Sequence, residues 1–220
     1  MSAPTNPLTP LSVMNARIHS VAEAGLCIAL FAVLQYLNIR LPINFAGGSI
    51  SLSMIPIVLF ALLNGPVAGL VCGALCGLVD LMLEPYIVNV AQVILDYPLA
   101  LACVGLAGLL APFVRNLALR GKRAWLAAAS FIAVLLGTSL RFIPHFISGV
   151  VFFASNAPKG ENVYLYSAIY QLSYLLPAGF ISAIILALVA PALLPALFRG
   201  RWRGAGGSQK SAQKGDDDAS

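Results

Sequence analysis

The chain has 220 residues, of which 60% are hydrophobic and only 10% are charged, and its mean hydropathy is +0.89. Soluble domains carry about 25% charged residues, so this composition excludes an ordinary soluble domain and indicates an integral membrane protein. The length allows one compact bundle and leaves no room for a separate soluble domain.

Apolar runs divide the chain into about six helices, each near the length that a helix needs to cross a bilayer. We expect the first span over residues 21–37, then a loop marked by proline and glycine, then a short second span over residues 50–63. The turn Asn64-Gly65-Pro66 leads into a third span that ends near Leu83. The remaining spans are expected over residues 88–110, 125–153 and 164–197, with the basic segment PFVRNLALRGKR as a loop after the fourth span.

Three parts follow along the chain: an N-terminal segment at residues 1–19, a six-helix membrane domain at 20–198 and a tail at 199–220. The N-terminal segment is polar and lacks the residue order of a cleaved signal, so we expect the first helix to be retained. Pro177, Pro191 and Pro195 are expected to kink or stop the last span. The tail is charged and rich in glycine and serine, which predicts disorder.

Lysines and arginines are divided unevenly between alternate loops. Only Arg40 and Lys159 fall on one side of the predicted bundle, whereas the N-terminus, the basic loop and the tail share the other side. The positive-inside rule therefore places both termini in the cytoplasm. The net charge of +5 is then a signal of topology, and we expect no nucleic-acid partner.

The four cysteines lie in apolar segments rather than in loops, so we expect small hydrophobic side chains without disulfides: Cys27, Cys72, Cys76 and Cys103. Cys72 and Cys76 share a helix face, but the sequence shows no nearby group that would complete a metal site. We therefore expect no bound metal.

Ionisable side chains within the spans are candidates for function, because each costs at least about 2.5 kcal/mol at membrane depth. Asp80, Glu84 and Arg141 fall near the ends of spans, where an interface would lower this cost. Asp96 lies several residues into the fourth span, with Gln92 one turn before it. Its carboxylate either bonds a neighbouring helix, pairs with Arg141, or binds a polar or cationic ligand, and the sequence leaves these interpretations open.

The fifth span carries Arg141, His145, Gly149 and Phe153 at four-residue spacing, which places them on one helix face. Gly149 would allow a backbone or a flat ring to approach closely. Pro144 removes a backbone hydrogen bond, as happens where a membrane helix lines a cavity.

The sixth span carries a second stripe with the same spacing, Tyr166, Tyr170 and Tyr174. A belt of tyrosines at the outer interface would explain Tyr164 and Tyr174. Together with Asp96 and the face of the fifth span, the stripe would instead form an aromatic cage with a negative group. Such a cage suits a flat, cationic small molecule.

The segments HFISGVVFF, APKG and LYSAIYQLSYLLP resemble the thiamine-specific S component of energy-coupling factor (ECF) transporters. SLSMIPIVLFALLNGPVAGLVCG and LDYPLALACVGLAGLLAPF resemble the early helices of that family, in the same order. The resemblance implies an all-α integral membrane protein, a six-transmembrane-helix bundle with both termini cytoplasmic. It also implies a pocket near the outer face, under the first loop, that binds thiamine.

The resemblance further implies the residues that bind the ligand: Tyr86, Asp96, Tyr97, His145, Gly149, Phe153, Tyr166 and Gln171. Three of them depart from the family pattern. Asp96 stands where the family usually has glutamate, Phe153 where it has a stacking tryptophan, and Gln171 where it has asparagine. These departures leave open whether the ligand is thiamine itself, a thiamine precursor or another flat, nitrogen-rich vitamin.

The partners implied by the resemblance are a transmembrane T component and two cytoplasmic ATPases in the plasma membrane of a prokaryotic cell. Small residues on the first helix would dock on the T component, here Gly25, Ala29 and Val33, although internal packing would explain them equally well. No phosphate-loop motif is present, so we expect the partners to hydrolyse ATP and this chain to bind no cofactor.

Three other classes of protein remain as alternatives. An intramembrane enzyme would use Asp80, Asp96 and His145, but no H-E-x-x-H or G-x-S-x-G motif is present, and we expect no enzyme. A purely structural subunit would require that Asp96 and His145 satisfy each other with no cavity between the helices. A stand-alone secondary transporter would need no ATPases.

Overall fold

The computed structural model describes residues 10–37, 39–40 and 49–217, with side chains for residues 18–37 and 51–200. The chain begins with a long helix, a pair of two-residue strands and two further helices: α1 (Pro10–Tyr36), β1 (Ile39–Arg40), β2 (Ser49–Ile50), α2 (Met54–Asn64) and α3 (Pro66–Leu83). The strands are antiparallel, with Ile39 opposite Ile50. Residues 41–48, between the strands, lie outside the described residues.

The second half of the chain forms three long helical segments. The first is built from five consecutive pieces: α4 (Val90–Ile94), the π-helical turn η1 (Leu95–Leu99), α5 (Ala100–Gly105), the 3₁₀ turn η2 (Leu106–Leu110) and α6 (Ala111–Leu119). The other two are the helices α7 (Arg123–Phe152) and α8 (Val163–Asp217), joined through the short 3₁₀ turn η3 (Ala154–Asn156).

The predicted six-helix membrane bundle is confirmed. Among the described residues, five helical segments are long and apolar enough to cross a membrane, and α2 is a shorter apolar helix of 11 residues. The outer faces of the bundle expose large apolar side chains such as Val67, Met82 and Leu188. Such surfaces suit lipid, because a soluble protein would bury most of them.

Two stretches are more helical than the sequence predicted. The segment PFVRNLALRGKR, expected as a loop, continues the fourth span as α6, with proline in its first turn, where a missing N–H costs little. Helix α8 does not end at Pro177, Pro191 or Pro195, and its backbone continues to Asp217 through the tail that was expected to be disordered. Once a helix is nucleated, each added residue gains a hydrogen bond, so propagation is easier than a new start.

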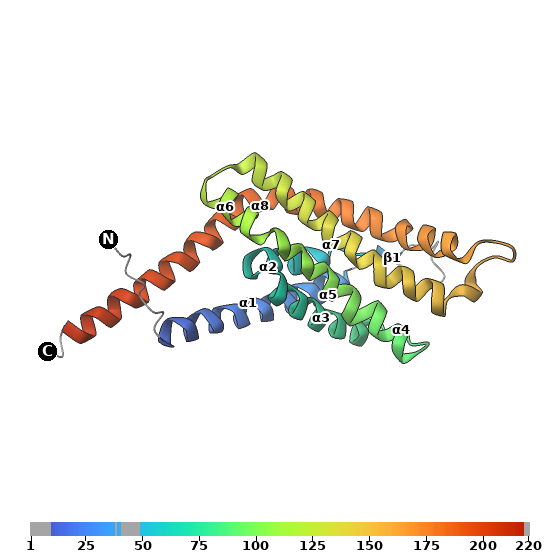
Figure 1. Cartoon of the computed structure of the whole chain (residues 1–220), viewed down its shortest axis with the longest axis horizontal. Coiled ribbons are helices and arrows are strands. Elements are labelled where there is room, and N and C mark those ends of the chain that lie inside the picture. Colours follow the sequence, from blue (N-terminus) through green and yellow to red (C-terminus); the bar gives the residue numbers. More distant parts are fainter. Residues whose placement is uncertain (1–9, 38, 41–48, 218–220) are drawn as a thin grey trace, which may run out of the picture.

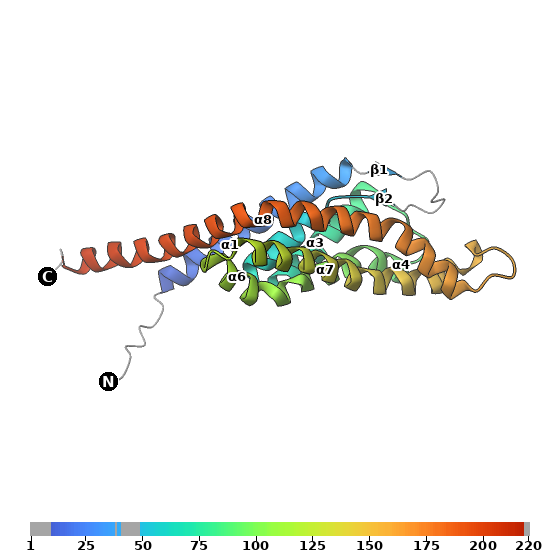
Figure 2. The same cartoon turned by 90° about the horizontal axis from the view of Figure 1, so that it is seen from above.

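The first turn of α1 and the last turn of α8 lie at the same end of the elongated molecule (Figures 1 and 2). The opposite end holds α4 and the connection between α7 and α8, and the short helix α2 lies between the long helices. Most α2 side chains are buried, including Met54, Ile57 and Val58.

Helix α3 and the fourth span are in close backbone contact. Gly69, Gly73 and Gly77 follow each other at four-residue spacing on α3, and they face Gly105, Leu101 and Tyr97 in turn. A methyl group on any of the three would overlap a backbone carbonyl of the fourth span. The two helices are therefore antiparallel with their backbones in contact, as small residues allow in membranes.

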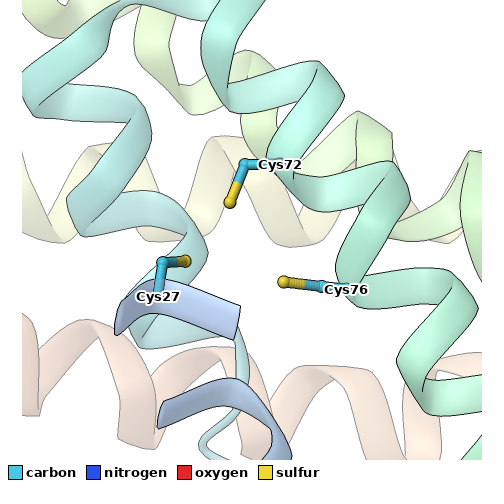
Figure 3. Close-up of side chains that lie close together, drawn as sticks. All are labelled: Cys27, Cys72 and Cys76. Carbon is cyan, nitrogen blue, oxygen red and sulfur yellow. The ribbon is translucent and has the colours of Figure 1, made fainter. Parts of the chain in front are cut away.

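Cys72 and Cys76 also lie on α3, and Cys27 of α1 lies beside them (Figure 3). The structure therefore adds a third thiol to this pair, and the expectation that no metal binds stays a prediction. The sequence does not show which helices are neighbours, so it did not indicate Cys27. The four cysteines are free thiols.

We predict that Gly73→Ala lowers the melting temperature of the detergent-purified protein, because its new methyl group would overlap the carbonyl oxygen of Leu101. Overpacking of this kind costs about 1–3 kcal/mol. Gly25→Ala is the matched control, since no atom lies within 4 Å of the added methyl and alanine has the higher helix propensity. Equal melting temperatures for the two variants would contradict the close α3 contact.

Candidate ligand-binding site

A cavity of about 560 Å³ lies where the end of α3, the turn η1, α7 and α8 meet. Its volume is within the range of about 300–1,000 Å³ that is usual for small-molecule sites. All of the binding residues named from the sequence line this cavity: Tyr86, Asp96, Tyr97, His145, Gly149, Phe153, Tyr166 and Gln171. The four-residue face of α7 is confirmed, because Arg141 lines the cavity with His145, Gly149 and Phe153.

Asp96 is held by three side chains from two helical segments. Its Oδ2 atom accepts hydrogen bonds from Gln92 Nε2 at 2.7 Å and from Ser148 Oγ at 2.8 Å. Its Oδ1 atom lies 3.2 Å from His145 Nδ1. A carboxylate has about four acceptor positions, so Oδ1 keeps acceptor capacity on the cavity side, where the Asp96 side chain is 16% exposed. Asp96 therefore bonds the neighbouring helix and faces the cavity at the same time.

His145 connects Asp96 to Arg141. The Nε atom of Arg141 donates a hydrogen bond to His145 Nε2 at 3.2 Å. Because a guanidinium only donates, His145 Nε2 is an acceptor, and the ring proton lies on Nδ1, directed at Asp96. The geometry is that of a neutral imidazole that bridges an arginine and a carboxylate. Within the described chain, Asp96 is thus hydrogen-bonded to His145, and no ion pair with Arg141 forms.

Gly149 sets the distance between α7 and α8. A methyl group there would overlap the hydroxyl of Ser167 and lie 3.3 Å from Gln171 Nε2. Gln171 in turn donates from Nε2 to the carbonyl oxygen of His145 at 3.1 Å, and its Oε1 accepts from the Tyr174 hydroxyl. Both polar ends of Gln171 are therefore engaged within the protein: Nε2 joins α8 to α7, and Oε1 bonds Tyr174 within α8.

Aromatic rings form much of the cavity wall. Tyr86 and Phe153 stack with a centroid separation of 5.9 Å and an interplanar angle of 28°. On α8, Tyr166 stacks on Tyr170 at 6.3 Å, and Tyr170 meets Tyr174 edge-on at 5.9 Å. The assignment of Tyr174 to an outer aromatic belt is wrong, because it is 8% exposed and lines the cavity.

The hydroxyl of Tyr97 closes the connection between α3 and α4. It donates to the carbonyl oxygen of Glu84 at 2.8 Å and accepts from the backbone N–H of Tyr86 at 2.8 Å. Pro98 lies next to it within η1, where proline has no N–H to contribute to a helix. Turns of π type often occur at functional sites, and this one carries Asp96 and Tyr97 as neighbours that bond in different directions.

Comparison with known proteins agrees with this architecture. The family model described as "Thiamine transporter protein (Thia_YuaJ)" matches residues 21–198. The chain belongs to this thiamine transporter family. It is 41% identical over 141 residues to the thiamine transporter ThiT of Bacillus subtilis (strain 168), covering 64% of this chain and 73% of that protein. The predicted resemblance to the thiamine-specific S component is thereby confirmed.

Two further relatives support the assignment to the thiamine transporter family. A ThiT of Lacticaseibacillus paracasei is 39% identical over 122 residues, which are 53% of this chain and 60% of that one. The solved structure of ThiT from Listeria monocytogenes is 26% identical and superposes with a TM-score of 0.75, over 83% of this chain and 98% of the other.

Several polar residues outside the predicted set also belong to the site. Among them, Gln35 and Asp80 line the cavity, and Ser148 donates a hydrogen bond to Asp96. Asp80 was expected near an interface, yet it is 7% exposed, lines the cavity, and its Oδ1 has no hydrogen-bond partner among the described residues. Asp80 follows Cys72 and Cys76 at four-residue spacing on the same helix face, and this pattern in the sequence could have predicted that Asp80 is buried. Ser148 follows His145 by three residues and so shares its helix face.

The residues predicted to dock a partner lie on the outer face of α1. Gly25 and Ala29 are exposed, and Val33 is 57% exposed. A side chain at Gly25 would meet no atom within 4 Å, so internal packing does not explain this glycine. Docking itself stays a prediction for this thiamine transporter family member.

We predict that Tyr97→Phe leaves the bundle folded but loosens the connection between α3 and α4. The substitution removes the hydroxyl that pairs Glu84 O and Tyr86 N, and a lost buried hydrogen-bond partner costs about 1–3 kcal/mol. Hydrogen–deuterium exchange of the peptide that contains Tyr86 is expected to become faster. Tyr164→Phe, on an exposed ring, serves as the control; unchanged exchange in Tyr97→Phe would show that other contacts hold this connection.

Proposed function

We propose that this chain is the substrate-binding membrane subunit of an ECF-type, ATP-driven vitamin importer, and that it binds thiamine in the cavity between α3, η1, α7 and α8. The observation that carries the proposal is a cavity of about 560 Å³ in which a carboxylate faces stacked aromatic rings. This observation is made in a chain whose relatives carry the name thiamine transporter.

The chemistry of the cavity suits a flat cation. Thiamine joins an aminopyrimidine, which donates hydrogen bonds, to a positively charged thiazolium ring. Asp96 offers the free acceptor position on Oδ1. Among the described residues that line the cavity, Asp80 and Glu84 add two more carboxyl groups, and Arg141 supplies one guanidinium. The rings of Tyr86, Phe153 and Tyr166 add stacking and cation–π attraction of about 0.5–2 kcal/mol for each favourable contact.

The three departures from the family pattern differ in how directly they affect the ligand. Gln171 is engaged by His145 O and Tyr174, so its exchange for asparagine acts on the α7–α8 contact more than on a ligand. Asp96 and Phe153 face the cavity directly, and a shorter acid and a smaller ring leave more room there. A thiamine precursor with the same aminopyrimidine is therefore the second candidate ligand.

Transport would follow from the orientation of the bundle. The basic residues favour cytoplasmic termini, and the cavity residues at the end of α7 and the start of α8 lie at the opposite end of the molecule (Figure 1). The cavity would then open to the outside of a prokaryotic plasma membrane. Release inward would require reorientation of the bundle on a T component, docked through the face of Gly25, Ala29 and Val33. Two partner ATPases would supply the energy, and the transport step would use no cofactor bound by this chain.

Titration of the purified chain with thiamine, followed by quenching of its intrinsic fluorescence, tests the proposal. We expect saturable one-to-one binding with a Kd below about 1 µM, equivalent to more than about 8 kcal/mol, and recovery of unchanged thiamine afterwards. Consumption of the ligand would indicate an enzyme. Sustained uptake by liposomes that contain this chain alone would indicate a secondary transporter, and a folded protein without thiamine binding would redirect the search to precursors.

We predict that Asp96→Asn weakens thiamine binding by about 10- to 100-fold, because a charge-assisted hydrogen bond contributes about 1.5–3 kcal/mol. The amide oxygen can still accept from Gln92 and Ser148, whereas the amide NH₂ would face Nδ1–H of His145 and lose that one bond. The fold should persist, and gel filtration checks this. Glu161→Gln is the matched control, since Glu161 is exposed and outside the cavity lining. Equal affinities for both variants would assign Asp96 a structural role only.

A further inference from the structure

A cluster of three cysteines lies in the apolar core, away from the cavity. Cys27 of α1 and Cys72 and Cys76 of α3 direct their sulfur atoms at one another, and all three sulfurs lie within 4.8 Å of one another (Figure 3). Their exposed fractions are 4%, 2% and 0%. The ligand-binding mechanism uses none of them.

The geometry fits one metal ion. With metal–sulfur bonds of about 2.3 Å, three sulfurs around a trigonal ion lie about 4 Å apart. The cluster is therefore close to that arrangement before any side chain moves. Within the described chain the group has three members, whereas structural zinc sites take four ligands in a tetrahedron. A three-sulfur site without a fourth ligand favours Cu(I), a soft ion that thiolates select and that accepts low coordination numbers.

Binding at this site is coupled to proton release. The three sulfurs belong to the same hydrophobic core as Phe31 and Ile57. Because the thiolate rather than the thiol ligates a metal, each sulfur that binds Cu⁺ loses its S–H proton. Three Cu–S bonds therefore release three protons to the solvent, and no electron is transferred.

We propose that Cys27, Cys72 and Cys76 form a Cu(I) site that fastens α1 to α3. Two buried stripes run from this site to the cavity at four-residue spacing: Cys27, Phe31 and Gln35 on α1, and Cys72, Cys76 and Asp80 on α3. Gln35 and Asp80 line the cavity. An ion that holds α1 against α3 therefore also holds Gln35 and Asp80 in their positions in the cavity wall.

Competition between the reduced, detergent-purified protein and the Cu(I) chelator bathocuproine disulfonate tests the site. We expect one Cu(I) per chain, an affinity at least 100-fold lower in Cys27→Ala and in Cys76→Ala, and no change in Cys103→Ala, whose thiol lies outside the cluster. Copper is also expected to raise the melting temperature of the wild type and of Cys103→Ala but not of Cys27→Ala, because a ligand stabilises only the state that binds it.

X-ray absorption of the copper-loaded protein should show three sulfur neighbours and no nitrogen or oxygen. The proposal is overturned if the wild type fails to compete with the chelator, or if Cys103→Ala loses copper as much as Cys27→Ala does. It is also overturned if copper-free Cys27→Ala and Cys76→Ala are folded, by gel filtration and melting temperature, and still bind copper as the wild type does.

Discussion

Contact between two backbones, that of α3 and that of the fourth span, determines where the site can form. Gly69, Gly73 and Gly77 bring α3 so close that its last contact is with the carbonyl of Tyr97. This contact fixes the turn η1, and η1 places Asp96 toward α7 while Tyr97 binds the connection after α3. The position of the Asp96 carboxylate in the cavity therefore depends on the close packing at the three glycines of α3.

Polar groups within the bundle bond to one another, so that few depend on a ligand. Asp96 receives hydrogen bonds from Gln92 and Ser148 and contacts His145, and His145 accepts from Arg141. Such a network holds the carboxylate in place before any ligand arrives, which reduces the ordering cost of binding. Among the described residues, Asp80 Oδ1 is buried without a partner, as are the hydroxyls of Ser130 and Ser182, which lie outside the cavity lining. A cavity that contains one unsatisfied acceptor gains most from a ligand that donates a hydrogen bond.

Much of this architecture could be predicted from the sequence, because hydropathy and four-residue spacing are local properties. They gave the bundle of spans, the face of His145, Gly149 and Phe153, and the tyrosine stripe of α8. The resemblance to the S-component family gave the list of cavity residues. Neither local patterns nor the resemblance showed that Tyr174 points inward, or that Gln171 is engaged by the backbone of α7.

The remaining differences depend on contacts between distant segments or on continuity of the backbone. Cys27 and Cys76 are far apart in the chain and meet only because α1 packs on α3. Asp80 seemed an interfacial residue because it precedes a loop, but it is 7% exposed and lines the cavity. Helix α6 seemed a loop because of its basic residues, yet a helix that enters with a proline in its first turn can place these residues outside while Val114 and Leu117 are buried.

Helix α2 is too short to cross a membrane, so the backbone before it needs cover from the rest of the protein. Its 11 residues extend about 16 Å, roughly half of a hydrocarbon core of about 30 Å. A helix of this length does not cross the hydrocarbon core on its own. Non-helical backbone is tolerated at membrane depth only where protein or a water-filled cavity covers it. The described residues directly before α2 meet this requirement, because β2 pairs with β1, Ser51 and Ser53 are buried, and Ser53 Oγ donates to Gln35 Oε1 of α1. The first turn of α2 is therefore covered by protein.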